Sequence, residues 1–341
     1  MRSASRGEVA RRGDHGSPSV ECPVNQGRAL RLHRPLAVLA VGTGVLAVVL
    51  LPAMALDDRQ LLSVSVWLKP WKFAVSIAIY SLTVAWMVTL VGTGARLART
   101  AATLAAVGLG VEMAIITVQA TRGVPSHFNT QTPLDGMLFN IMGASIITVW
   151  AATLALVLAR QRLADRVLAV GLRWGLAVSL LGMILAVLMI NPINQWVQQL
   201  SHGPPPLLDG GHTVGGVDGG PGLPVTNWSL HAGDLRVPHF VGIHALQLLP
   251  LVAWLLSRHG RRLGLGTETL VGLVRVAGLG YLGVVVLLVW QALRGEPVTR
   301  PGVATLAAAG VLLAGMAAAV FLAALRPRAT PTGEPGEPTR R

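Results

Sequence analysis

Residues 101–121 read AATLAAVGLGVEMAIITVQAT, an apolar run that contains a single charged side chain, Glu112. A helix rises 1.5 Å per residue, so a run of this length extends over roughly 30 Å, the thickness of the hydrocarbon layer of a membrane. The run does not alternate apolar and polar residues as the strands of a membrane β-barrel do. It therefore predicts a transmembrane helix.

Similar apolar runs recur along the whole chain of 341 residues. Hydrophobic residues make up 52% of the sequence and charged residues 13%, and the mean hydropathy is +0.59. Soluble domains carry about a quarter charged residues. The sequence therefore predicts an all-α, polytopic transmembrane helix bundle within residues 35–326. Its eight predicted spans cover residues 36–56, 71–91, 101–121, 136–158, 167–190, 238–256, 270–293 and 303–325.

The basic residues predict the orientation of this bundle. Arginine is concentrated in residues 1–34, in the connectors after the second, fourth and sixth spans, and after residue 325. Cytoplasmic connectors carry such an excess, so both termini are predicted to be cytoplasmic. The Ala-, Gly-, Leu- and Arg-rich composition is typical of a high-GC bacterium, which predicts the cell (inner) membrane as the location. The formal charge of +13 then reflects topology and requires no nucleic-acid partner; the partner is the lipid bilayer.

Three segments lie outside the predicted spans. Residues 1–34 and 327–341 are poor in apolar residues and are predicted to be disordered cytoplasmic tails. The extracytoplasmic connector 191–235 is far longer than a usual link, and its middle, 203–224, is mostly Gly and Pro and is predicted to be flexible.

Polar residues inside the spans gather at the predicted extracytoplasmic end. Glu112 lies about 13 Å below the end of its span, and Gln119 lies above it on the same side of the helix. Ionisable groups are costly in hydrocarbon and mark ion, proton or substrate paths. A protonated glutamate that bonds a neighbouring helix is the alternative interpretation.

Both lysines of the chain, Lys69 and Lys72, occur in the string WLKPWKF at residues 67–73. One interpretation is an interfacial anchor, because tryptophan and lysine are typical of the headgroup level. The other is a binding role, since Lys72, Ser76 and Thr83 lie at similar angles of a helix and predict a polar face inside the bundle.

The connector after residue 121 and the span after residue 235 supply the other candidates. In the connector these are Arg122, His127, Asn129 and Asp135, with Asp135 also a candidate helix cap, and Asn140 extends this surface into the next span. The later span supplies Arg236, His239, His244 and Gln247. His244 lies at a depth similar to that of Glu112, so the two are predicted to be partners. A histidine bonded within a helix interface is the alternative for His239 and His244.

The strings KPWKF, SHFN, TPLD and PHFVGIHALQLLP together resemble a group of uncharacterised bacterial multi-pass inner-membrane proteins. The resemblance covers residues 59–256. It implies the membrane fold and no activity, and it assigns no residue a role.

Three classes of function fit these residues. The first is binding or transport of a small or lipid-like ligand, with Glu112 and His244 titrating and Lys72 and Arg236 favouring an anion. The second is a membrane-embedded metal-dependent hydrolase with His127, His239 and His244 around the metal and Glu112 as general base, although the usual histidine pair at i, i+4 is absent. Glu112 and His244 are the candidate catalytic residues. The third is a haem or quinone redox protein with a histidine ligand. Metal and haem are both compatible with the sequence, which requires neither.

Overall fold

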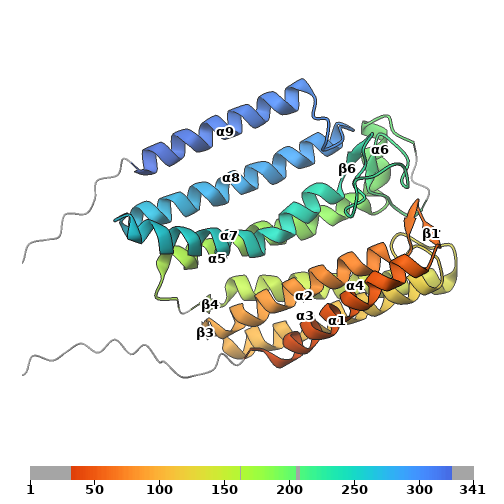
Figure 1. Ribbon diagram of the computed structural model, residues 1–341, viewed down its shortest axis with the longest axis horizontal. Coiled ribbons are helices and arrows are strands. Elements are labelled where there is room, and N and C mark those ends of the chain that lie inside the picture. Colours follow the sequence, from red (N-terminus) through yellow and green to blue (C-terminus); the bar gives the residue numbers. More distant parts are fainter. Residues whose placement is uncertain (1–31, 162, 205–207, 325–341) are drawn as a thin grey trace, which may run out of the picture. The chain divides into compact units, whose positions relative to one another are not determined.

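The computed structural model describes residues 32–161, 163–204 and 208–324, and most of this part of the chain is helical. The helices are α1 (Arg34–Leu56), α2 (Leu68–Thr89), α3 (Ala95–Thr121), α4 (Pro133–Leu158), α5 (Arg166–Ile184), α6 (Ile193–Leu200), α7 (Arg236–Arg262), α8 (Thr267–Leu293) and α9 (Val303–Ala324) (Figure 1). A 3-10 turn, Leu185–Met189, extends α5. Within the described residues, 8 helices are long and apolar enough to cross a membrane, which confirms the predicted polytopic bundle.

Short two-stranded antiparallel sheets lie between some of these helices. They pair β1 (Gln60–Leu61) with β2 (Val64–Ser65), β3 (Val91–Thr93) with β4 (Arg160–Gln161), and β5 (Thr213–Val214) with β6 (Gly233–Asp234). The first and third sheets lie at the end of the bundle that carries the connectors 57–67, 122–132, 190–204 with 208–235, and 294–302, which we call the loop end (Figure 1). The second lies at the opposite end.

Local sequence fixes several helix ends. Thr132 caps α4, because its hydroxyl accepts a hydrogen bond from the backbone N–H of Asp135 at 3.1 Å. The Asp135 carboxylate in turn accepts from the Thr132 hydroxyl at 2.6 Å, so the cap of this helix is Thr132, and Asp135, predicted as a capping group, instead supports the Thr132 side chain. At the opposite end, Asp165 caps α5 and also accepts a hydrogen bond from Ser257 of α7 at 2.7 Å.

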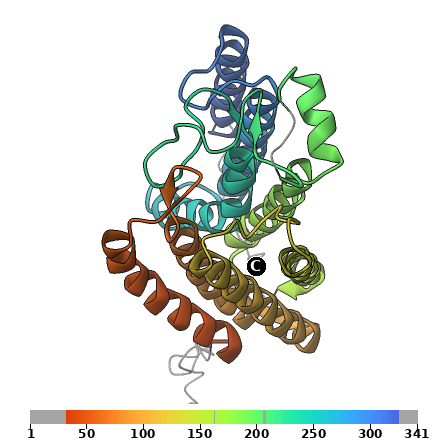
Figure 2. The ribbon, with the colours of Figure 1, turned by 90° about the vertical axis from the view of Figure 1, so that its right-hand side faces the viewer.

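The spanning helices form two groups. Helices α1 to α4, the first half, pack mainly on one another, and α5, α7, α8 and α9, the second half, do the same (Figures 1 and 2). The two halves meet through α4 against α5 and through α2 against α7.

The closest helix contact lies inside the second half, between α5 and α7. A side chain added at Gly171, Gly175 or Gly182 of α5 would collide with Ala253, the Ala245 carbonyl or the backbone at Gly242, all on α7. Small residues let membrane helices approach in this way, because lipid provides no hydrophobic force that drives helices together. On α9, by contrast, a side chain at Gly310 would meet nothing within 4 Å, and most of that helix faces outward.

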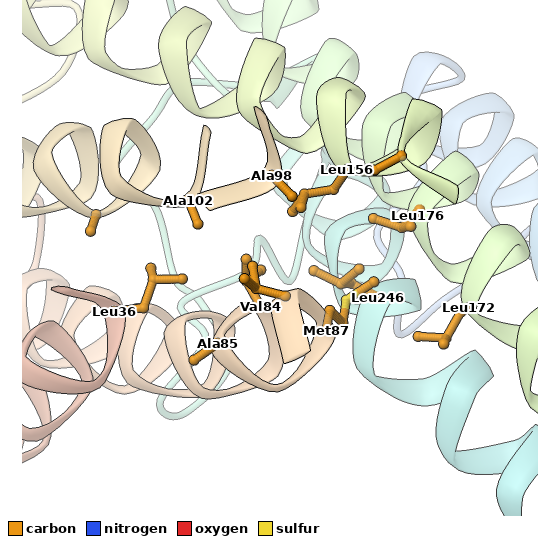
Figure 3. Close-up of a cluster of buried hydrophobic side chains, with 13 residues drawn as sticks. Leu36, Val84, Ala85, Met87, Ala98, Ala102, Leu156, Leu172, Leu176 and Leu246 are labelled. Atoms are coloured by element: carbon orange, nitrogen blue, oxygen red, sulfur yellow. The ribbon is translucent and has the colours of Figure 1, made fainter. Parts of the chain in front are cut away.

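Apolar side chains close the junction of the two halves at the end opposite the loops. Residues from α1 to α5 and α7 point toward one another there (Figure 3). We call this cluster the apolar seal. Its members include Leu36, Val84, Met87, Ala98, Leu156, Leu172, Leu176 and Leu246. The polar candidate residues lie nearer the loop end, so the junction is apolar at one end and polar at the other.

Candidate functional site

Residues 208–235, which we call the cap, cover the loop end of both halves. The Asp209 N–H donates to the Phe128 carbonyl at 2.8 Å, and the Ser63 hydroxyl donates to the Gly219 carbonyl at 2.9 Å. Beyond these contacts with the first half, Gly233 lies against the backbone of Ala292 at the end of α8. The cap includes most of the segment predicted to be flexible, and these contacts hold its described part against the bundle.

Beneath the cap, three titratable side chains from three different elements form a continuous polar chain. Lys69 lies in the first turn of α2, His127 in the connector 122–132, and Glu112 in α3. The Lys69 Nζ lies 3.1 Å from His127 Nδ1, and His127 Nε2 lies 3.3 Å from Glu112 Oε1. Glu112 is almost fully buried, with 1% of its surface exposed. We call these residues the Lys69–His127–Glu112 chain.

The fold of the connector aims His127 into the bundle. The Asn129 side chain accepts a hydrogen bond from the Gln131 N–H at 3.1 Å and donates to the Pro125 carbonyl at 3.2 Å, which fixes the turn around His127. The imidazole then packs against Phe73 and Phe139, with ring centroids 5.7 Å and 6.5 Å away. The predicted ligand-binding residue Asn129 thus shapes the connector.

One tautomer of His127 fits both contacts. A lysine ammonium only donates, so with Lys69 as an ammonium His127 Nδ1 accepts and Nε2–H donates to Glu112 Oε1. Burial lowers the pKa of His127, and the charge of Lys69 lowers it further, while the hydrogen bond to Glu112 acts in the opposite direction. His127 is therefore a neutral bridge between an ammonium and a carboxylate.

Nine buried side-chain atoms have no hydrogen-bond partner among the described residues. Among them are Glu112 Oε2 on α3 and, on α7, His244 Nε2 and Gln247 Oε1. An unsatisfied buried polar atom costs roughly 1–3 kcal/mol. Such atoms are typical of places where water or a ligand supplies the missing partner.

The predicted pairing of Glu112 with His244 is wrong, because the described contacts join Glu112 to His127 instead. The His244 ring packs on Phe240, with ring centroids 4.2 Å apart. The predicted polar face of α2 is also wrong. Its buried side carries residues such as Ala74 and Val84, and Thr83 bonds the Ile79 carbonyl of its own helix.

The candidates Gln119, Arg122 and Asp135 form a separate network that ties α3 to α4. Gln119 Nε2 donates to Asp135 Oδ1 at 2.9 Å, and Arg122 Nη1 contacts the same oxygen at 2.6 Å. Arg122 also bonds the Gln119 side-chain carbonyl. These groups satisfy one another, so their place in the fold is structural.

The remaining candidates lie apart from the chain. Asn140 is exposed on α4 and lines a shallow groove on the outer surface with residues such as Met137. The ring of His239 pairs its Nδ1 with the Gly182 carbonyl at 2.8 Å, at the close crossing of α5 and α7. Arg236 bonds Asp234 at 2.6 Å. Among the residues the structure describes, no group of three or more His, Cys, Asp or Glu side chains could hold a metal ion.

Two features were missed by sequence reasoning. Lys72 reaches the cap, where its Nζ donates to the Thr226 carbonyl at 3.0 Å. His212, in the segment predicted to be flexible, lies partly buried beside Asp218, with 3.0 Å between His212 Nδ1 and Asp218 Oδ1. The alternation of Asp and His in the cap is a weak signal, because polar loops commonly contain both.

The fold and these contacts define an integral, multi-pass membrane protein with a buried polar chain beneath a cap. Comparison of the chain with protein-family models, with curated proteins and with solved structures finds no match.

Proposed function

We propose that this protein binds and transports a small or lipid-like anionic ligand between its two halves, at the loop end. The observation that carries the proposal is the set of unsatisfied buried atoms on α3 and α7, Glu112 Oε2, His244 Nε2 and Gln247 Oε1. They come from opposite halves at similar depth. Glu112 Oε2 and Gln247 Oε1 are acceptors, so the ligand would supply donor groups such as hydroxyls to these atoms in addition to its negative charge.

The immediate surroundings of Lys72 favour an anion. The carboxylate of Glu112 balances the ammonium of Lys69 through His127, and Asp234 pairs with Arg236. Lys72 has no counter-ion among the described residues. Its Nζ contacts a backbone carbonyl, and no carboxylate lies in salt-bridge range of it. A cation without a counter-ion at the mouth of a low-dielectric site attracts negative charge.

The apolar seal supports transport over simple binding. It closes the junction of the two halves at the end opposite the loops, while the polar chain lies on the loop side. A polar site that lies under a cap at one end and is closed by apolar side chains at the other would have to open at either end in turn, as alternating access requires. The hydrolase alternative is less well supported, because His127 bonds Lys69 and Glu112, and His239 bonds a backbone carbonyl.

The test is thermal unfolding of the purified protein in nanodiscs, with and without carboxylates, phosphate and lysophospholipids. A true ligand at a hundred times its Kd stabilises the folded state by about 2.7 kcal/mol. The stabilisation is expected to disappear in Lys72→Met and in Gln247→Leu, and to persist in the surface control Asn140→Ala. Equal shifts in all variants, or no shift with any of these anions, would overturn the proposal.

A further inference from the structure

We propose that the Lys69–His127–Glu112 chain is a proton relay, which carries protons from the loop end to the buried carboxylate of Glu112. The coupling of this relay to a carried ligand rests on the proposed function, but proton delivery itself does not. The geometry that carries the inference is the use of both ring nitrogens of one histidine, each by a different titratable group.

The step is balanced within the three side chains. Lys69 Nζ–H breaks and His127 Nδ1–H forms, while His127 Nε2–H breaks and Glu112 Oε1–H forms. Lysine becomes a neutral amine, glutamate a neutral acid, and the imidazole ends as its other neutral tautomer. After Glu112 releases its proton, a rotation of the ring and the uptake of a proton by Lys69 from the loop end reset the relay.

The position of the chain gives the transfer a direction across the membrane. Lys69 lies in the first turn of α2, at the loop end, whereas Glu112 lies nine residues, roughly 13 Å of helical rise, before the end of α3. The connector links the two side chains because His127 lies between α2 and α3 and contacts both. The Ser126 hydroxyl, 3.2 Å from His127 Nδ1, offers a second entry for protons at the same nitrogen.

The other charged groups near His127 do not compete for the transfer. On α2, Lys72 is held by the Thr226 carbonyl, and on α7, Arg236 is held by Asp234. His239, also on α7, uses its Nδ1 at the Gly182 carbonyl. On the α4 side, His127 meets the ring of Phe139, which is not titratable. Within the part of the chain that the structure describes, His127 alone bridges Lys69 to Glu112.

The test follows the carbonyl stretch of protonated Glu112 by infrared difference spectroscopy after a rapid pH drop, in detergent and without any ligand. Glu112→Gln identifies the band by removing it. In His127→Gln, an amide still bonds both neighbours but cannot pass a proton. Its rate of Glu112 protonation is expected to fall on the order of a hundredfold, the scale of a positioned proton-transfer group. In His127→Ala, added imidazole is expected to restore the rate.

His239→Gln is the matched control, a buried histidine engaged in helix packing, and it is expected to keep the wild-type rate. Wild-type kinetics in His127→Gln, or equal slowing in His239→Gln, would overturn the relay, as would a Glu112 band that never forms. If His127→Ala does not fold, His127→Gln still decides the matter. Ligand stabilisation is measured separately, so a relay without a ligand refutes only the proposed function, and a ligand without a relay refutes only this inference.

Discussion

A double-mutant cycle on Lys69 and Glu112 tests the charge assignment directly. The two hydrogen bonds of 3.1 Å and 3.3 Å, with the imidazole ring between them, place the ammonium and the carboxylate at most about 8–9 Å apart. At an effective dielectric constant near 20, the attraction between the two charges is then about 2 kcal/mol. Lys69→Met and Glu112→Gln each remove this attraction, so the double variant is expected to be about 2 kcal/mol more stable than additivity implies.

The assay is the free energy of unfolding of the wild type, both single variants and the double variant, in one membrane mimic at neutral pH. Lys69→Met with Asp165→Asn is the control cycle, because Asp165 caps α5 at the opposite end of the bundle and is expected to give an additive result. A coupling below about 0.5 kcal/mol for Lys69 and Glu112 would refute the reasoning, since a neutral lysine beside a protonated glutamate has no charge attraction to lose.

Three further predictions concern stability. Gly182→Ala is expected to destabilise the fold by about 1–3 kcal/mol, because the new methyl group meets the backbone of α7, whereas Gly143→Ala, with open space around it, is expected to be neutral or stabilising by thermal unfolding. Asp135→Ala is expected to cost about 2–3 kcal/mol by losing charge-assisted hydrogen bonds, while Asn140→Ala on the exposed side of α4 is expected to change stability by no more than about 0.5 kcal/mol. Burial lowers the pKa of His212 to about 4, so the unfolded chain binds a proton there before the folded one does, and stability is expected to fall as the pH drops from about 6.5 toward 4. His212→Asn is expected to flatten that slope in unfolding measured against pH, and an unchanged slope would show that His212 is not its source.

The membrane fold could be predicted because it rests on local properties. Length and hydropathy define each span, and every predicted span corresponds to a helix of the structure. Boundaries were less accurate where a helix begins with polar or aromatic residues. The second span was predicted to begin at residue 71, whereas α2 begins at Leu68, so that Lys69 lies inside the helix. The short helix α6 was missed, because its polar sequence resembles a loop.

The site could be predicted only in part, because its contacts join distant segments. Glu112 was identified from its cost in hydrocarbon, a property of the residue itself. Its partner was misassigned, because depth was counted along helices and His127 lies in a connector, where helical rise gives no depth. The alternative interpretation of His239 as a packing residue is the one the contacts favour. The sequence alone could not decide between a packing role and a ligand role for His239. The deciding contact is the Gly182 carbonyl, which reaches the ring because α5 and α7 approach so closely.

Binding of an anion and protonation of Glu112 by the proposed relay are expected to oppose each other. Transfer of a proton from Lys69 to Glu112 leaves the net charge of the Lys69–His127–Glu112 chain unchanged but removes the positive charge of Lys69. An anion held near Lys69 stabilises the ammonium, by about 2 kcal/mol at 8 Å with an effective dielectric constant of 20, and therefore keeps Glu112 ionised. Departure of the anion removes that stabilisation and favours the protonated acid. Ligand occupancy and protonation of Glu112 thus oppose each other, so an anion that stabilises the protein is also expected to weaken the infrared band of protonated Glu112.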